Sequence, residues 1–191
     1  NDMKAAAHKI KTLLKTIFTV DHYKVRKEKD TGELLGEYDR VNIDRGDAVA
    51  VVLFNPAKQT VVLIHQFRLA SYTRGGDGML WEIPAGMIEL QEQPETVAIR
   101  ETLEETGFSI HSPQPILKTI IAPGIMNEYI HLYYAEYNDA SRVADGGGLA
   151  HEGEHIEVHE FALERALLMV DQGEIEDAKT ILGLQWLQLN N

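Results

Sequence analysis

The sequence contains no cysteine among its 191 residues, so disulfides and thiolate metal sites are excluded. No apolar run approaches the roughly 20 residues of a membrane-spanning helix. No basic patch offsets the formal net charge of −12, which argues against binding to nucleic-acid phosphates. The N-terminal stretch lacks the apolar core of an export signal. We therefore expect a cytoplasmic globular protein without a membrane or nucleic-acid partner.

Patterns typical of β-strands dominate the first part of the sequence. Phe18–Glu28 and Glu33–Ile43 alternate apolar and polar residues around a turn signal, which predicts an antiparallel hairpin. Ala48–Asn55 and Gln59–Phe67 are rich in β-branched residues and predict a second hairpin with at least one buried strand. Lys9–Val20, in contrast, begins with a helix-like pattern.

The later part of the chain mixes strands with a few helices. Further strands are expected within 79–85, 116–122, 129–137 and 155–161, and helices within 95–106, 163–171 and 178–189. Many strands with few helices, not in strict alternation, favour an α+β fold with a mixed sheet over a doubly wound parallel sheet. We expect residues 1–43 to form a separate N-terminal β-layer and residues 44–191 to form one catalytic domain.

The helix expected at 95–106 carries an unusual concentration of negative charge. Pro94 suits its first turn and Gly107 suits the residue after its end. A helical projection predicts a core face and an opposite acidic face, the former from Thr96, Ile99, Leu103 and Thr106 and the latter from Glu101, Glu104 and Glu105.

This acidic face has two local penalties. Glu101 and Glu105 are four residues apart, where like charges repel, and they lie near the helix C-terminus, where the helix dipole disfavours negative charge. A divalent cation such as Mg²⁺ would turn this repulsion into a binding site, because it prefers hard oxygen ligands. A solvated acidic face remains the alternative interpretation.

The spacing of this region resembles a known signature. Gly86, Glu92, Arg100-Glu101, Glu104-Glu105 and Gly107 match the Nudix box, G-x5-E-x7-R-E-U-x-E-E-x-G-U, where U is apolar. The departures are Thr102, where the box prefers an aliphatic residue, and Phe108 at the last apolar position. Both lie outside the set of carboxylates.

The resemblance implies an α/β/α sandwich around a mixed sheet and a metal-dependent hydrolase. Glu101 and Glu105 match the family's main ligands for Mg²⁺ or Mn²⁺, and the backbone carbonyl of Ala85 matches its non-carboxylate ligand. Glu104 is implied to be a further ligand or a base. Arg100 is implied to orient the glutamates, although it could also be an ordinary surface arginine.

The resemblance continues beyond the box. Pro123, in the stretch APGIMNE, resembles a feature of ADP-ribose pyrophosphatases and related nucleoside-diphosphate-sugar hydrolases. By the same resemblance, Glu152 is implied to be the catalytic base and Glu154 a metal ligand, unless their loop is simply a solvated acidic loop. Arg68 is implied to contact a phosphate or ribose, and Glu128 to accept a hydrogen bond from the terminal sugar.

The function implied is Mg²⁺-dependent hydrolysis of ADP-ribose to AMP and ribose 5-phosphate. A GDP-mannose hydrolase, or a broader nucleoside-diphosphate-sugar hydrolase, is the alternative. A sensor that binds ADP-ribose without cleaving it is disfavoured, because the box glutamates are all present. The N-terminal layer suggests a homodimer, since the subfamily commonly pairs that layer.

Other chemistries have less support. No pair of the histidines has helical zinc-ligand spacing beside a third ligand, and no serine lies in a G-x-S-x-G context. Gly146-Gly147-Gly148 lacks the lysine and helix that follow a phosphate-binding loop, so we expect these glycines to make a mobile loop.

Overall fold

The protein is described here by a computed structural model that covers residues 3–149 and 153–191. The chain divides into two compact units. Unit 1 comprises Asn1–Gly46 with Ile120–Tyr129, and unit 2 comprises Asp47–Thr119 with Ile130–Asn191. The later segment of unit 1 was not expected from sequence, where only residues 1–43 were assigned to an N-terminal layer.

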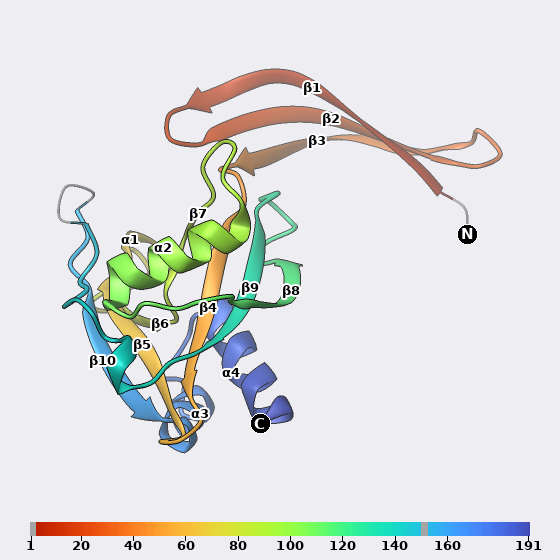
Figure 1. The fold of residues 1–191 in the computed structure, drawn as a ribbon. Coiled ribbons are helices and arrows are strands. Elements are labelled where there is room, and N and C mark those ends of the chain that lie inside the picture. The colour runs from red at the N-terminus through yellow and green to blue at the C-terminus, as the bar shows by residue number, and fades with distance from the viewer. Residues whose placement is uncertain (1–2, 150–152) are drawn as a thin grey trace. The chain divides into compact units, whose positions relative to one another are not determined.

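Unit 1 contains a three-stranded antiparallel sheet in the order β1-β2-β3 (Figure 1). Its strands are β1 (Met3–Lys15), β2 (Thr19–Lys29) and β3 (Leu34–Asp44), and the pairing of β2 with β3 confirms the predicted hairpin. The helix-like reading of Lys9–Val20 was wrong, because β1 pairs with β2 over its full length. An isolated short helix is marginal in water, whereas this ladder pairs the backbone groups of β1 that face β2.

Unit 2 is built on a seven-stranded mixed sheet with the main path β10-β5-β4-β9-β8. β4 pairs in parallel with β9 and antiparallel with β5 and β7, and β5 also pairs antiparallel with β6 and β10. The strands are β4 (Ala48–Asn55), β5 (Thr60–Phe67), β6 (Met79–Glu82), β7 (Ala85–Met87), β8 (Gln114–Ile120), β9 (Tyr129–Glu136) and β10 (Glu157–Ala162). The mixed sheet confirms the predicted fold class.

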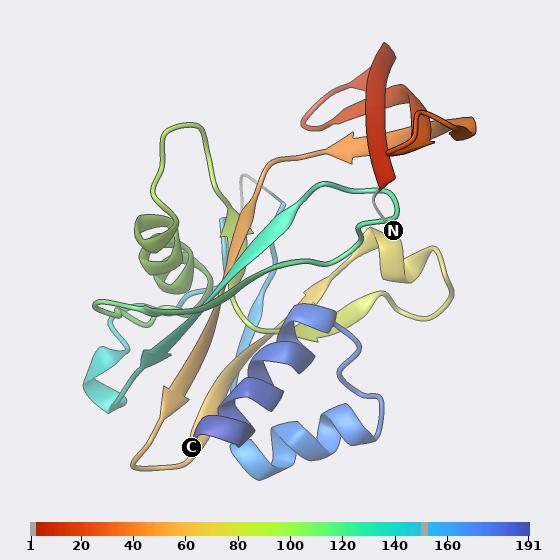
Figure 2. The ribbon, with the colours of Figure 1, turned by 90° about the vertical axis from the view of Figure 1, so that its right-hand side faces the viewer.

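Helices cover both faces of this sheet (Figure 2). α2 (Pro94–Thr106) packs on one face, and α3 (Leu163–Asp171) and α4 (Ala178–Asn190) pack on the other. All eight residues of β4 are buried, and alternate side chains enter the two cores. The short helices α1 (Leu69–Tyr72) and η1 (Asp139–Ser141) lie in connections. No helix in the described part of the chain is long and apolar enough to cross a membrane.

The orientation of α2 differs from the prediction. Its buried residues are Val97, Ala98, Thr102, Glu105 and Thr106. Of the predicted core face, Thr106 is buried and Ile99 is partly buried against the core, whereas Leu103 is 37% exposed and Thr96 is exposed, so the prediction was right only in part. Glu105 can turn inward because a backbone group solvates its carboxylate, a partner that helical periodicity does not reveal.

Candidate active site

Glu105 is the most deeply buried acidic residue of α2, at 2% exposure. Its Oε2 accepts a hydrogen bond of 2.8 Å from the backbone N–H of Ala85, the first residue of β7. This bond joins the helix to the strand that carries the predicted backbone ligand. Burial at such a depth strongly desolvates a carboxylate.

Glu101 lies one helical turn earlier and packs directly on Gly86. A Cβ atom added to Gly86 would lie 1.9 Å from Cδ and 2.1 Å from Oε1 of Glu101, so a side chain at position 86 would displace this carboxylate. Gly86 is therefore required by the close approach of Glu101 and not by a turn, since it lies within β7 and pairs with Val49. The first glycine of the sequence signature thus fixes where Glu101 lies.

Arg100 forms the expected ion pairs with neighbouring glutamates. Its Nη1 lies 2.8 Å from Glu101 Oε1 and 3.0 Å from Glu104 Oε2. Its Nη2 lies 3.3 Å from Glu92 Oε2. One guanidinium therefore holds three carboxylates of the motif. Whether it orients them for catalysis stays a prediction.

The acidic side chains also act on one another. Burial, opposed by Arg100 and reinforced by the charges of Glu104 and Glu154, raises the pKa of Glu101 from 4.5 to about 7. Burial raises the pKa of Glu105 well above 4.5 despite the Ala85 hydrogen bond, and the charges of Glu101 and Glu154 add to this effect. Glu154 therefore lies near enough to both helix residues to repel them. These residues, Glu101, Glu104, Glu105 and Glu154, are called the acidic cluster below.

The acidic cluster has the donor chemistry that Mg²⁺ and Mn²⁺ prefer, since every group is a carboxylate oxygen. Burial raises the pKa of Glu101 and of Glu105, and neighbouring carboxylate charges add to this effect, so a bound cation would offset the repulsion. Among the residues that the structure describes, however, no three acidic or histidine side chains already surround a common point. Glu101 and Glu104 face Arg100 instead, so a metal ion would have to draw them away from the guanidinium.

Arg68 belongs to a buried charge network that the sequence analysis missed. Its Nε and Nη2 donate to the two oxygens of Glu82, at 2.7 and 2.9 Å. Lys179 Nζ donates to Glu82 Oε2 at 2.6 Å and lies 3.0 Å from Asp177 Oδ2. Glu82 is only 2% exposed. The lone charged residue inside the apolar strand MLWEIPA was the signal that could have revealed it.

Two further predicted site residues, Glu128 and Glu152, lie outside the described part of unit 2. Glu128 lies in unit 1, where its Oε1 is 3.2 Å from Nε of Arg45. Glu152, the predicted base, lies outside the described residues. The roles proposed for both residues stay predictions.

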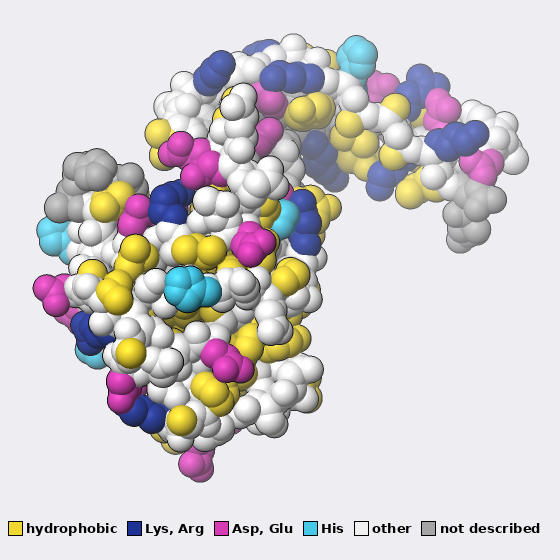
Figure 3. Space-filling view, viewed as in Figure 1, with side chains coloured by type: hydrophobic (Ala, Val, Ile, Leu, Met, Phe, Trp, Pro, Cys, Tyr) yellow, Lys and Arg dark blue, Asp and Glu magenta, His cyan; other side chains and the backbone are white. Residues whose placement is uncertain are grey.

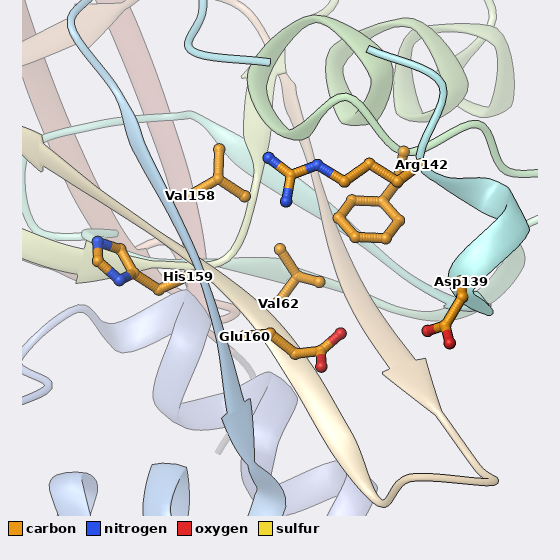
Figure 4. A pocket seen from close by; sticks show the side chains of 7 residues that line it. Val62, Asp139, Arg142, Val158, His159 and Glu160 are labelled. Atoms are coloured by element: carbon orange, nitrogen blue, oxygen red, sulfur yellow. The ribbon is translucent and has the colours of Figure 1, made fainter. Parts of the chain in front are cut away.

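A cavity of about 230 Å³ lies on unit 2, apart from the acidic cluster (Figure 4). Val62 and Val158 line it with apolar surface, and the Arg142 guanidinium and the Glu160 carboxylate approach it from different sides. Of the residues proposed above for catalysis or metal binding, none that the structure describes lines it. The candidate site is thus defined by charge and backbone geometry and not by this cavity.

Comparison with known proteins decides the family. The NUDIX domain family matches residues 44–184. This chain is 42% identical to the GDP-mannose pyrophosphatase of Cronobacter sakazakii over 182 residues, which cover 95% of this chain and 93% of the relative. It is 39% identical to the GDP-mannose pyrophosphatase of Salmonella typhimurium over 184 residues, covering 96% and 94%. The chain belongs to the Nudix family. It is a Nudix hydrolase with its box on β7, the following loop and α2.

Thr102 is the Nudix-box departure that the structure makes interpretable. It is completely buried, and its Oγ1 finds no hydrogen-bond partner within the described parts of the chain. A buried hydroxyl without a partner costs stability. The aliphatic residue usual in the Nudix box would avoid that cost.

We expect Thr102→Val to raise the free energy of unfolding by about 1 kcal/mol, because valine keeps the shape and removes the unpartnered hydroxyl. Thr106→Val is the matched contrast. Thr106 Oγ1 donates to Thr102 O at 2.5 Å and accepts from Phe108 N–H at 3.2 Å, so this variant should lose about 1 kcal/mol or more. Urea unfolding at pH 7 measures both changes. A loss of stability in Thr102→Val would show that its hydroxyl is satisfied in solution.

Proposed function

We propose that this protein hydrolyses the pyrophosphate linkage of GDP-mannose, which yields GMP and mannose 1-phosphate. Support for the substrate comes from relatives named GDP-mannose pyrophosphatase that align with nearly the whole chain. Support for the reaction class comes from the acidic cluster. The sequence analysis expected ADP-ribose as the substrate and GDP-mannose as the alternative. The proposal adopts that alternative.

The residues that would hold Mg²⁺ or Mn²⁺ are Glu101 and Glu105, the backbone carbonyl of Ala85, and Glu154. The bound metal would supply charge to offset the diphosphate and to activate water. Arg100, which pairs with Glu101 and Glu104 at 2.8 and 3.0 Å in the metal-free structure, would release Glu101 to the metal and keep Glu104 on the same side of α2. Glu104, or Glu152 as first predicted, would accept the proton from the attacking water.

Arg68 would contact a phosphate group in this scheme. Its Nε and Nη2 are engaged by Glu82, and the charge of Glu105 also acts on it. Because the bidentate pair fixes the plane of the guanidinium, the remaining donors keep a constant direction. A fixed cation near the acidic cluster suits an anionic substrate.

A substrate panel tests the proposal. The protein is incubated with Mg²⁺ and GDP-mannose, ADP-ribose or GDP-glucose, and release of GMP or AMP is followed by chromatography. We expect kcat/KM to be highest for GDP-mannose. Preference for ADP-ribose would restore the first sequence expectation, which the resemblance of the APGIMNE stretch favours. Binding without release of monophosphate would identify the non-catalytic sensor.

We further propose that unit 1 pairs two chains into a homodimer. Ile10, Leu13 and Leu14 on β1 each leave about half of their surface exposed, and Leu34 and Leu35 on β3 do the same. Hydrophobic side chains are visible on this sheet between lysine and arginine side chains (Figure 3). Exposed apolar surface of this kind marks interaction sites.

We expect Leu13→Lys to lower the solution mass from two chains to one, because it introduces a charge into the apolar part of β1. Leu189→Lys is the control, since Leu189 is an exposed leucine at the end of α4 in unit 2. Size-exclusion chromatography with light scattering measures both masses. A dimer that survives Leu13→Lys would place the contact elsewhere.

A further inference from the structure

The segment Gly146–Gly148 is bonded to the last turn of α2. The N–H of Gly147 donates to the carbonyl of Glu105 at 2.9 Å, and the N–H of Gly148 donates to the carbonyl of Glu104 at 3.1 Å. The last carbonyls of a helix have no partner within the helix, so these bonds satisfy them. The mobile loop expected from sequence is therefore docked on the helix that carries the acidic cluster.

This docking depends on glycine at each position. The φ angles of Gly146, Gly147 and Gly148 are 74°, 106° and 75°, a region that residues with a side chain rarely adopt. A Cβ atom on Gly146 would also lie 2.5 Å from the backbone carbon of Thr106. Three consecutive residues of this kind bring the main chain close against the helix end.

The same segment touches the carboxylate of Glu154. A Cβ atom on Gly148 would lie 2.5 Å from Oε2 of Glu154, and this oxygen accepts a hydrogen bond of 2.9 Å from the N–H of Leu149. The carbonyl of Gly147 also accepts from the N–H of Ile156 at 3.2 Å, which ties the chain beyond Glu154 to the same segment. Gly148 thus contacts both the backbone carbonyl of Glu104 and the carboxylate of Glu154.

We propose that Gly146–Gly148 is a positioning element that holds the carboxylate of Glu154 at a set place beside Glu101 and Glu105. The inference rests on the proposed function in one respect, namely that the carboxylate of Glu154 binds a metal ion. A segment that merely capped α2 would need its two N–H donors alone. Gly148 also packs directly against Glu154, which capping does not require. The position of the Glu154 carboxylate therefore depends on the absence of a side chain at Gly148.

Gly148→Ala tests the proposal, with Gly173→Ala as the matched control. Both glycines have φ 75°, but a Cβ on Gly173 meets nothing within 4 Å, so the control carries the backbone strain without the contact. Mn²⁺ alone is titrated into each protein, and free Mn²⁺ is followed by electron paramagnetic resonance. We expect Gly148→Ala to weaken Mn²⁺ binding at least about tenfold, as for other groups that orient metal ligands. Gly173→Ala should bind as the wild type does.

A double-mutant cycle with Glu154→Gln shows whether the effect passes through that carboxylate. Adding Gly148→Ala to Glu154→Gln should cause no further loss of affinity, whereas two independent effects would add. Additive losses, or wild-type affinity in Gly148→Ala, would overturn the proposal. If Gly148→Ala fails to fold, Glu154→Asp is tested in its place, because the shorter side chain withdraws the carboxylate from the N–H of Leu149. Wild-type Mn²⁺ affinity in Glu154→Asp would equally overturn the proposal.

The outcomes separate this inference from the proposed function. If wild-type protein releases no monophosphate from any sugar nucleotide and the Mn²⁺ results hold, the positioning stands and the proposed function fails. If GDP-mannose is hydrolysed but Gly148→Ala binds Mn²⁺ normally, the positioning fails alone. Absence of Mn²⁺ binding by the wild type would overturn the positioning as well.

Discussion

Glu105→Gln is expected to lower Mg²⁺-dependent hydrolysis by at least about 100-fold while leaving the fold intact, since a lost charge-stabilising group typically costs that much. Burial raises the pKa of Glu105 well above 4.5, because the buried site of the metal-free protein disfavours the charged carboxylate. Glutamine has the same shape and no charge. We therefore expect the stability of the metal-free protein to be unchanged or raised at pH 7.

Two measurements check this result. Monophosphate release at saturating GDP-mannose gives turnover, and thermal unfolding with and without Mn²⁺ gives stability. The wild type should gain stability from Mn²⁺, because a ligand that binds only the folded state raises its melting temperature, and Glu105→Gln should not. Glu95→Gln, an exposed position in the first turn of the same helix, is the control and should behave as the wild type. Near-normal turnover in Glu105→Gln would refute its role as a ligand.

Glu82→Gln is expected to destabilise the protein strongly. Burial alone would raise the pKa of Glu82, but hydrogen bonds and charge from Arg68 and Lys179 outweigh it and lower the pKa from 4.5 to about 2. That shift corresponds to about 3 kcal/mol of stability. Removing one partner of a buried pair costs a similar roughly 3–5 kcal/mol, because the other charges stay buried.

The pH dependence of this loss has a definite sign. The folded pKa of Glu82 is below its usual value, so its contribution is present above pH 4.5 and is lost as the pH falls toward about 2. The gap in unfolding free energy between wild type and Glu82→Gln should therefore be largest near pH 7 and shrink below pH 4.5. Glu164→Gln, at an exposed position on α3, should show no such gap. A gap that is constant with pH would show that Glu82 contributes through shape and not through charge.

Local sequence rules predicted most of unit 2. Pro94 and Gly107 bracket α2 as expected, with Gly107 in the left-handed conformation at its end. The helices α3 and α4 and the hairpin of β4 with β5 also agree with the patterns read from sequence. These elements can be predicted from sequence because their caps, turns and apolar spacing are local. β1 was missed because its structure comes from pairing with β2, a partner beyond the segment itself.

The candidate site was predicted in composition but not in arrangement. The spacing of Glu101 and Glu105 identified the acidic residues, and in the structure burial, with the charge of Glu101 adding to it, raises the pKa of Glu105. The burial of Glu105 was not predicted, since the partner of its carboxylate is a backbone N–H twenty residues away in sequence. Lys179 lies 97 residues from Glu82, so no local pattern could have joined them.

The burial of β4 has a consequence for how the protein opens. Every residue of this strand is buried, and it bonds to β5, β7 and β9. No local fluctuation can expose its amides without separating several neighbours at once. Amide hydrogen exchange in β4 should therefore proceed only through global unfolding, and its rate reports the stability of the entire unit.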